Sequence, residues 1–102
     1  SVAGVEPVLR PKRPPSRLFH GTVAANLESI LRKGLLPMRR HHVHLSADEA
    51  TATLVGGRRG TPVVLTVDAA RMERDGHQFY VSENGVWLAE AVPARYLTSP
   101  LQ

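Results

Sequence analysis

The sequence has 102 residues, of which 42% are hydrophobic, 22% charged and 5% aromatic, which fits a single domain with one modest core. It contains no Cys, which excludes a disulfide scaffold, a thiolate zinc site and a cysteine nucleophile. It also lacks a secretory signal pattern and any run near the roughly 20 apolar residues of a membrane span, so we expect a cytoplasmic location without membrane contact. Thirteen Lys and Arg against nine Asp and Glu give a net charge of +4, which favours phosphate-bearing partners.

The N-terminal segment, residues 1–16, is rich in proline and in basic side chains. Proline fixes the backbone and removes a hydrogen-bond donor, so such a segment is typical of an extended linker. We therefore predict a proline-rich basic leader over residues 1–16 and a folded domain over residues 17–102. The residues concerned are Pro7, Pro11, Pro14 and Pro15, together with Arg10, Lys12 and Arg13.

The first predicted elements of the domain are a short strand and a helix. The strand begins at Leu18-Phe19 and ends at His20-Gly21-Thr22. Thr22 is the expected N-cap, and apolar residues at helical spacing carry the helix to a stop signal at Gly34.

A second strand and helix follow at the centre of the chain. Residues 42–45 predict a short strand, and Ser46-Ala47-Asp48-Glu49 matches a capping box, in which Ser46 begins the helix and Glu49 bonds back to it. The helix is expected to end at Gly56-Gly57. Arg58-Arg59-Gly60 then forms a basic loop directly after it.

The next segment contains the strongest strand signal in the chain. Pro62–Val67 is apolar on both faces, which indicates a central strand. Asp68 is the expected cap of a short helix that ends at Gly76.

The C-terminal part predicts a hairpin. Residues 78–81 and 86–88 are strand-like and flank Asn84-Gly85, which is a signal for a tight turn. Residues 96–98 are a candidate for closing the sheet. Short strands mixed with three short helices, without regular alternation, predict an α+β fold with small mixed or antiparallel sheets and flanking helices.

The first candidate site is His20-Gly21-Thr22, at the predicted junction of strand and helix. A glycine there lets a ligand approach the backbone, and the helix N-terminus offers amides to a phosphate or a ribose oxygen. The structural alternative is a histidine that simply completes a turn beside an N-cap.

The second candidate site is the pair His42 and His44. Strand alternation places both side chains on one face, with Val43 and Leu45 on the other. A zinc site would need a third protein ligand, which no spacing in the sequence supplies, so we expect no metal. The pair therefore predicts the floor of a polar cleft, with a solvent-facing edge strand as the alternative.

The third candidate is Arg58, whose guanidinium on a glycine-flanked loop suits bidentate contact with phosphate oxygens. A solvated charged loop is the alternative. We expect Trp87 to anchor the core, and Glu83 has no paired carboxylate at a recognisable interval. The residues alone thus predict a small basic domain with a cleft suited to phosphates, and no particular reaction.

Taken together, these motifs resemble the RNA 2′-phosphotransferase family of the KptA type. The resemblance rests on many collinear motifs rather than on one rare signature. They are Leu18-Phe19-His20-Gly21-Thr22, Gly34-Leu35, His42-Val43-His44-Leu45-Ser46, Val55-Gly56-Gly57-Arg58-Arg59-Gly60, Asp68-Ala69, Asp75-Gly76, Phe79-Tyr80 and Asn84-Gly85-Val86-Trp87-Leu88. Ser1-Val2 and the leader are similar to the segment that joins the family's two lobes.

The resemblance implies a two-lobed architecture of which this chain is one half. Family members have an N-terminal winged-helix-like lobe for RNA and a C-terminal ADP-ribosyltransferase lobe that holds NAD. This chain resembles the C-terminal lobe alone. The winged-helix-like lobe, which this sequence does not contain, is its expected partner. Of the family's catalytic Arg-His-Arg-Arg set, only the last member matches this sequence, at Arg58.

The resemblance also implies the residues that hold NAD. His20 takes the position that holds a ribose, with Gly21 and Thr22 beside it. His44 replaces the tyrosine that packs on the nicotinamide in related enzymes, and Ser46 ends the same motif. Val86 occupies the position of the catalytic glutamate of other ADP-ribosyltransferases.

The implied reaction removes an internal 2′-phosphate from RNA, as in RNA repair or tRNA splicing. The phosphate attacks the nicotinamide-bearing ribose carbon of NAD and nicotinamide leaves. The ribose 2″-hydroxyl then attacks the phosphorus, which releases 2′-hydroxyl RNA and ADP-ribose 1″,2″-cyclic phosphate. We expect a monomer that is inactive or weakly active as an isolated lobe. The alternatives are a divergent ADP-ribosyltransferase for other phosphate ends or protein, and a non-catalytic module that binds NAD or RNA.

Overall fold

The structure is a computed structural model that describes residues 9–101. In chain order, its elements are β1 (Leu18–Val23), α1 (Ala24–Lys33), β2 (Val43–Leu45), α2 (Glu49–Gly57), β3 (Pro62–Val67), α3 (Ala69–Arg74), β4 (Tyr80–Val81), β5 (Trp87–Ala89), the 3-10 turn η1 (Ala94–Tyr96) and β6 (Leu97–Thr98). This mixture of short helices and strands confirms the predicted α+β class. Among the described residues, no helix is long and apolar enough to cross a membrane.

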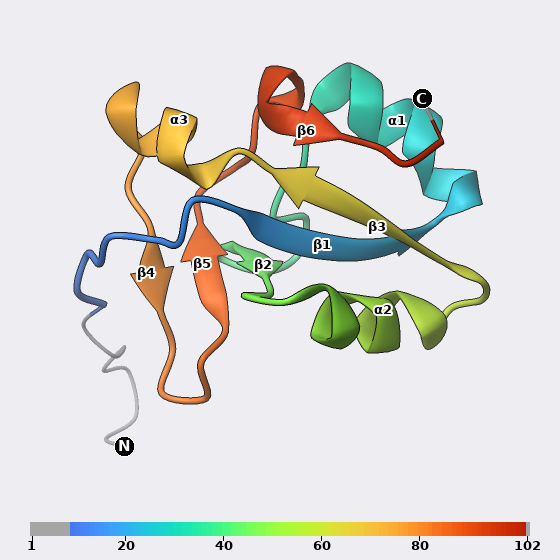
Figure 1. Ribbon diagram of the computed structural model, residues 1–102, viewed down its shortest axis with the longest axis horizontal. Coiled ribbons are helices and arrows are strands. Elements are labelled where there is room, and N and C mark those ends of the chain that lie inside the picture. Colours follow the sequence, from blue (N-terminus) through green and yellow to red (C-terminus); the bar gives the residue numbers. More distant parts are fainter. Residues whose placement is uncertain (1–8, 102) are drawn as a thin grey trace.

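The strands form two small antiparallel sheets of three strands each, in the orders β1-β3-β6 and β2-β5-β4. The sheets meet where Phe19 of β1 pairs with Ser46, just after β2, through two backbone hydrogen bonds of 2.9 and 2.8 Å. In Figure 1, β2, β5 and β4 lie to one side of the longer β1 and β3, and α2 runs alongside β1. The bridge therefore brings the end of β2 next to the part of β1 that carries His20.

The strand β3 lies between β1 and β6, as its apolar sequence predicts. Its residues alternate between buried and half-buried positions, and Leu65 and Val67 are fully buried. Removing such a side chain from a packed core typically costs about 2–5 kcal/mol for leucine to alanine. This strand is therefore the centre of the first sheet and of its hydrophobic core.

Close packing of α2 on β1 depends on two glycines. A Cβ added at Gly21 would lie 1.8 Å from the carbonyl oxygen of Ala52, and one at Gly56 would lie 2.8 Å from that of Thr22. Both positions therefore need a residue without a side chain. The space that the sequence assigned to a ligand in front of the Gly21 α-carbon is filled by the α2 backbone.

The expected N-cap at Thr22 is wrong. The strand β1 continues to Val23, which is the N-cap of α1 and makes no side-chain cap hydrogen bond. Thr22 is buried within the strand, opposite Val63 of β3, and its hydroxyl accepts a hydrogen bond from the Asn26 amide at 3.3 Å. Pairing with β3 holds this β-branched residue in extended backbone, so the helix begins later than its capping signal suggests.

The capping box at Ser46 is also wrong. Asp48 is the N-cap of α2, and its carboxylate accepts a hydrogen bond from the Thr51 backbone amide at 2.7 Å. The backbone of Ser46 is instead committed to its pairing with Phe19. The contact between the sheets holds Ser46 outside the helix, and Asp48 caps it instead.

The predicted Asp68 cap and the predicted hairpin are both confirmed, although the hairpin turn differs from the expected type. Asp68 caps α3, accepting a hydrogen bond from the Arg71 amide at 3.1 Å. The strands β4 and β5 form the predicted hairpin, but its turn spans residues 82–85, with the Gly85 amide bonded to the Ser82 carbonyl at 2.9 Å. Gly85 has a φ of 80°, whereas Asn84 keeps a negative φ, so the turn is not the tight type that needs positive φ at both positions.

Part of the predicted leader packs on the domain. Residues 1–8 of it lie outside the described range. Beyond them, Pro11 pairs with Tyr80, the Lys12 amide bonds to the Phe79 carbonyl at 2.8 Å, and Pro14 is buried. Figure 1 shows this stretch passing beside β4. Residues 11–14 thus cover the edge of the second sheet rather than standing away from it as a linker.

Candidate functional site

The second sheet has an inner and an outer face. Val43, Leu45, Trp87 and Ala89 are buried in the core, so Trp87 is the core anchor that the sequence predicts. On the other face, His44 is directly opposite Leu88, which is directly opposite Tyr80. Side chains of directly paired residues share a face, so these three form one row across the outer face.

Leu88 shows that this outer face is itself covered. It is only 7% exposed, yet it lies outside the main core cluster. Its burial therefore comes from its neighbours on the outer face rather than from the core beneath the sheet. The histidine pair predicted by strand alternation lies here, with His44 exposed and His42 half-buried.

The two histidine motifs meet at this face. His20 Nδ1 lies 3.3 Å from the carbonyl oxygen of His44, and because a carbonyl can only accept, this nitrogen carries the hydrogen. In the neutral imidazole, Nε2 is then the acceptor. Burial lowers the pKa of His20, the hydrogen bond with His44 opposes this effect, and the positive charge of Arg59 lowers the pKa further. Together, burial and Arg59 favour the neutral form of His20, and the contact with the His44 carbonyl favours the tautomer with its hydrogen on Nδ1.

Arg40 is a residue of this site that the sequence analysis missed. Its Nη1 lies 3.0 Å from Nδ1 and 3.3 Å from Nε2 of His44. An atom in the ring plane and this close to both nitrogens would collide with Cε1 between them, so the guanidinium lies over one face of the ring. Burial, Arg40 and His42 all lower the pKa of His44. The basic run before β2 was the available signal, since it places Arg40 four residues before His44.

The backbone of Gly21 faces the gap between the sheets. Both the N–H and the C=O of Phe19 point to Ser46. Since alternate residues of a strand point their backbone groups the same way, those of Gly21 point to the same side, away from β3. Within residues 9–101 no strand pairs with that edge at Gly21. Gly21 therefore presents one donor and one acceptor beside His20.

Ser46 and Val86 lie together at one end of β2 and β5. Continuing the register of these strands by one residue places Ser46 opposite Val86, on the same face as His44. The Val86 backbone amide donates a hydrogen bond to the Ser82 hydroxyl at 3.1 Å. The structure therefore brings three predicted site residues, His44, Ser46 and Val86, to one end of the outer face.

Arg58 follows the last residue of α2. It is the exposed C-cap of α2, and in the described part of the chain no hydrogen bond or ion pair joins its guanidinium to His20 or His44. Its neighbour Arg59 is the residue whose charge acts on the pKa of His20. Gly56 packs against Thr22 of β1, which brings the loop that follows α2 near the strand that carries His20, and Arg59 is the arginine of that loop whose charge acts at His20.

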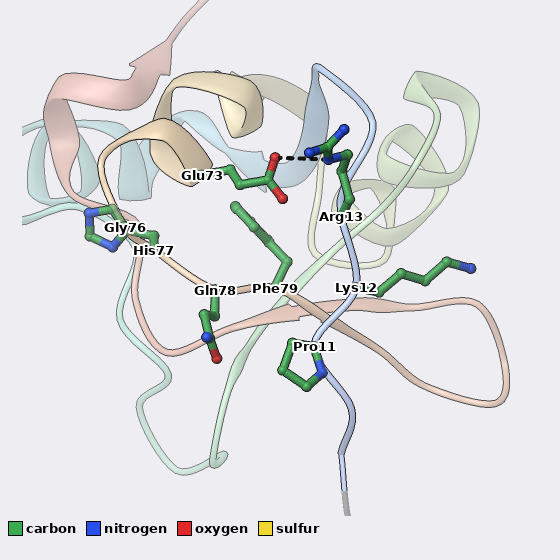
Figure 2. A pocket seen from close by; sticks show the side chains of 8 residues that line it. All are labelled: Pro11, Lys12, Arg13, Glu73, Gly76, His77, Gln78 and Phe79. Carbon is green, nitrogen blue, oxygen red and sulfur yellow. Dashed lines mark ion pairs between the residues drawn. The ribbon is translucent and has the colours of Figure 1, made fainter.

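Two hollows of the structure lie beside residues 76–78, away from His20 and His44. Two cavities, of about 340 and 350 Å³, flank residues 76–78. Figure 2 shows the first, with Arg13 and Glu73 paired at its rim. None of the predicted site residues lines either cavity. The site around His20 and His44 therefore lies apart from both of these cavities, where the two sheets meet.

Metal ligation has no support from this geometry. Over residues 9–101, no three His, Cys, Asp or Glu side chains lie close enough together to hold a metal ion. His42 instead makes an edge-on contact with the ring of Tyr80, with centroids 5.7 Å apart.

Comparison with known proteins shows the family of this chain. The model of the RNA 2′-phosphotransferase, Tpt1/KptA family matches residues 1–91. The chain belongs to this family. A probable RNA 2′-phosphotransferase of Streptomyces coelicolor is 66% identical over 87 residues, which are 85% of this chain and 48% of that protein. The corresponding protein of Rhodopirellula baltica is 58% identical over 100 residues, 98% of this chain and 54% of its own length.

Membership in the family confirms the resemblance drawn from the collinear motifs. The chain spans about half the length of the relatives it matches, 48% and 54% in the two named above. For this chain, the activity of a whole family member is therefore a proposal.

Proposed function

We propose that this chain is the NAD-holding, ADP-ribosyltransferase-like part of an NAD-dependent RNA 2′-phosphotransferase. The observation that carries the proposal is the contact between His20 and the His44 carbonyl, which joins both family histidine motifs into one surface. Bound NAD would supply the electrophilic ribose carbon to which the RNA 2′-phosphate is transferred, with 2′-hydroxyl RNA, nicotinamide and ADP-ribose 1″,2″-cyclic phosphate as products.

The chemistry of the site fits a flat, positively charged ring that bears a carboxamide. One face of His44 is covered by Arg40, and the exposed side chain leaves the other face for stacking. The edge of Gly21 offers a donor and an acceptor that match a carboxamide. The pKa values of His20 and His44 are both lowered, so neither imidazole repels a cationic ring at neutral pH.

His20 is suited to hold a ribose hydroxyl. Its Nδ1 donates to the His44 carbonyl, so its neutral Nε2 accepts. A hydroxyl of the sugar donates to that nitrogen in our proposal. A protonated His20 could not make this bond, which links ribose binding to the burial that lowers its pKa.

Arg58 and Arg59 provide positive charge for phosphate groups. They follow α2 directly and stand beside β1, where a guanidinium can make paired hydrogen bonds to phosphate oxygens. We assign Arg58 to the transferred phosphate, where a fixed cation stabilises charge that builds up during the reaction. The Thr22 side chain is buried and accepts a hydrogen bond from Asn26, so we assign it to support of the site rather than to contact with the ligand.

Val86 favours a phosphate as the acceptor over a protein side chain. A valine cannot activate a hydroxyl or a carboxyl group, whereas a phosphate is already an anionic nucleophile. Unaided turnover is a separate matter, because the other three members of the Arg-His-Arg-Arg set belong to a lobe outside this sequence. We therefore propose that the chain by itself binds NAD and turns over weakly or not at all.

Two measurements test the proposal. Calorimetry should show saturable, one-to-one binding of NAD to this chain, and absence of binding would overturn the NAD assignment. When this chain is joined to an N-terminal lobe of the family, NAD labelled in its ADP-ribose should give labelled ADP-ribose 1″,2″-cyclic phosphate only in the presence of RNA with an internal 2′-phosphate. Transfer to RNA with terminal phosphates or to protein would instead support the divergent ADP-ribosyltransferase, and binding without any transfer would support a non-catalytic module.

A further inference from the structure

The outer face of the second sheet does not end at the candidate site. The row that begins at His44 continues through Leu88 to Tyr80, and Pro11 pairs with Tyr80 at the far edge. We propose that this far end is a subsite for a nucleobase of single-stranded RNA, stacked on Tyr80 and bound at its edge by Gln78 and Glu90. The proposal rests on the proposed function, because it places the subsite relative to a reaction centre at His44.

The spacing suits a nucleotide next to the reacting one. Neighbouring strands lie about 4.8 Å apart, so Tyr80 is roughly 10 Å from His44 across β5. That is within reach of the base that flanks a phosphate held near His44. Leu88 lies between them in the row and is buried beneath its neighbours.

Two contacts fix the Tyr80 ring. The edge-on contact with His42 has an interplanar angle of 63°, and the phenol donates a hydrogen bond to Gln78 Oε1 at 3.2 Å. An edge contact does not cover a ring face in the way that parallel stacking does. The ring is therefore held in place while remaining able to stack with a base.

The cavity beside Tyr80 has the size and the groups for a base edge. It measures about 350 Å³, and its lining includes Tyr80, Gln78 and Glu90. Small-ligand sites start at roughly 300 Å³. An amide can donate and accept, and a carboxylate accepts from paired N–H donors, so guanine is the base whose edge suits Glu90 best.

Positive charge next to this cavity favours RNA over a free nucleoside. The cavity of Figure 2, on the other side of residues 76–78, is lined by Lys12 and Arg13 of the leader and by Glu73, with which Arg13 is paired. In Figure 2, Gln78 and Phe79 leave the chain in opposite directions, and Lys12 extends away from the Arg13–Glu73 pair. Aromatic stacking beside basic side chains is the usual arrangement in proteins that bind single strands.

The test compares RNA pentamers with an internal 2′-phosphate that carry either guanine or an abasic site next to the phosphate. Binding to this chain is measured by fluorescence anisotropy at one fixed salt concentration. For the native chain, loss of the base should weaken binding about 5- to 100-fold, the range for one base–aromatic stack. Tyr80→Leu should weaken binding of the intact pentamer by a similar factor and leave binding of the abasic pentamer unchanged.

Three further variants sharpen the result. Tyr80→Phe should retain most of the affinity, because the ring stays and only the bond to Gln78 is lost. Glu90→Gln should remove the preference for guanine over uracil. Leu54→Ala, an exposed position on α2, is the control and should change nothing.

Equal weakening of intact and abasic RNA in Tyr80→Leu would overturn the subsite, as would no weakening at all. Tighter or equal binding of free guanosine monophosphate would show a nucleotide site unrelated to an RNA strand and would also overturn it. NAD binding is measured in the same variants and should not change. If the native chain fails to bind NAD, the proposed function fails, while the base dependence still decides the subsite separately.

Discussion

The guanidinium of Arg40 covers one face of the His44 imidazole, with Nη1 3.0 and 3.3 Å from the two ring nitrogens. A cation held there disfavours a second positive charge on the ring, and it lowers the pKa of His44 together with burial and His42. The same contact orients the ring, so that its other face is presented to a ligand. Arg40 is in this sense a positioning residue.

Replacing Arg40 by glutamine should raise the pKa of His44, because the nearest cation is removed. We expect NAD binding to weaken about two- to fivefold, in line with the energy of one exposed cation–ring contact, and to weaken more at pH 6 than at pH 8. The pKa is read from the pH dependence of the His44 ring signals in NMR spectra. Arg39→Gln is the matched control, and an equal pKa change in both variants would contradict the specific contact.

The free energy of unfolding should fall as the pH drops below the ordinary histidine value of 6.5. The pKa values of His20 and His44 are lowered in the folded chain, so the unfolded chain takes up protons first and is favoured in acid. The stabilisation from the two neutral histidines is fully present above pH 6.5. It is lost as the pH falls towards their lowered pKa values in the folded chain. Urea unfolding between pH 5 and pH 8 measures it, and His20→Asn should flatten the dependence. An unchanged slope in that variant would show that His20 does not carry the effect.

Gly21→Ala should destabilise the fold, because its Cβ would meet the Ala52 backbone oxygen at 1.8 Å. We expect a loss at the upper end of the roughly 1–3 kcal/mol range for overpacking, since backbone rather than a flexible side chain is in the way. Gly57→Ala is the control: nothing lies within 4 Å of its Cβ, and it should raise stability by up to about 1 kcal/mol. Urea unfolding compares the two, and similar midpoints would refute the tight packing of α2 on β1.

When this chain is joined to an N-terminal lobe of the family, Arg58→Ala and His20→Ala should fail in opposite ways. Loss of Arg58 should slow phosphate removal about 100- to 1,000-fold with NAD affinity largely kept, as expected for a cation that stabilises developing charge. Loss of His20 should weaken NAD affinity first. Calorimetry with NAD and an assay for the conversion of 2′-phosphorylated RNA to 2′-hydroxyl RNA separate the two effects. If Arg58→Ala lost both equally, its assignment to the phosphate would be incorrect.

Features set by neighbouring residues were predictable from the sequence. The apolar run of β3 indicated a central strand, and alternation placed His42 and His44 on one face, apart from Val43 and Leu45. The Asp68 cap and the hairpin at residues 82–85 are equally local. The family could be inferred from collinear motifs, since their order and spacing are properties of the chain itself.

Features that depend on partners distant in the chain were not predictable. Thr22 and Ser46 both carry capping signals, but pairing with Val63 and Phe19 keeps each in extended backbone. The role of Gly21 became visible only with α2 packed against it.

The composition of the site follows the same division. By itself, the amino-acid order determined which imidazoles and guanidiniums the chain carries and on which side of a strand they point, because such alternation is a property of the local backbone. Only the tertiary structure decided that the His44 carbonyl binds His20, that Arg40 covers His44, and that Arg59 acts on His20. Those relations arise where two sheets and a helix meet, and periodicity along one segment carries no information about its distance from another.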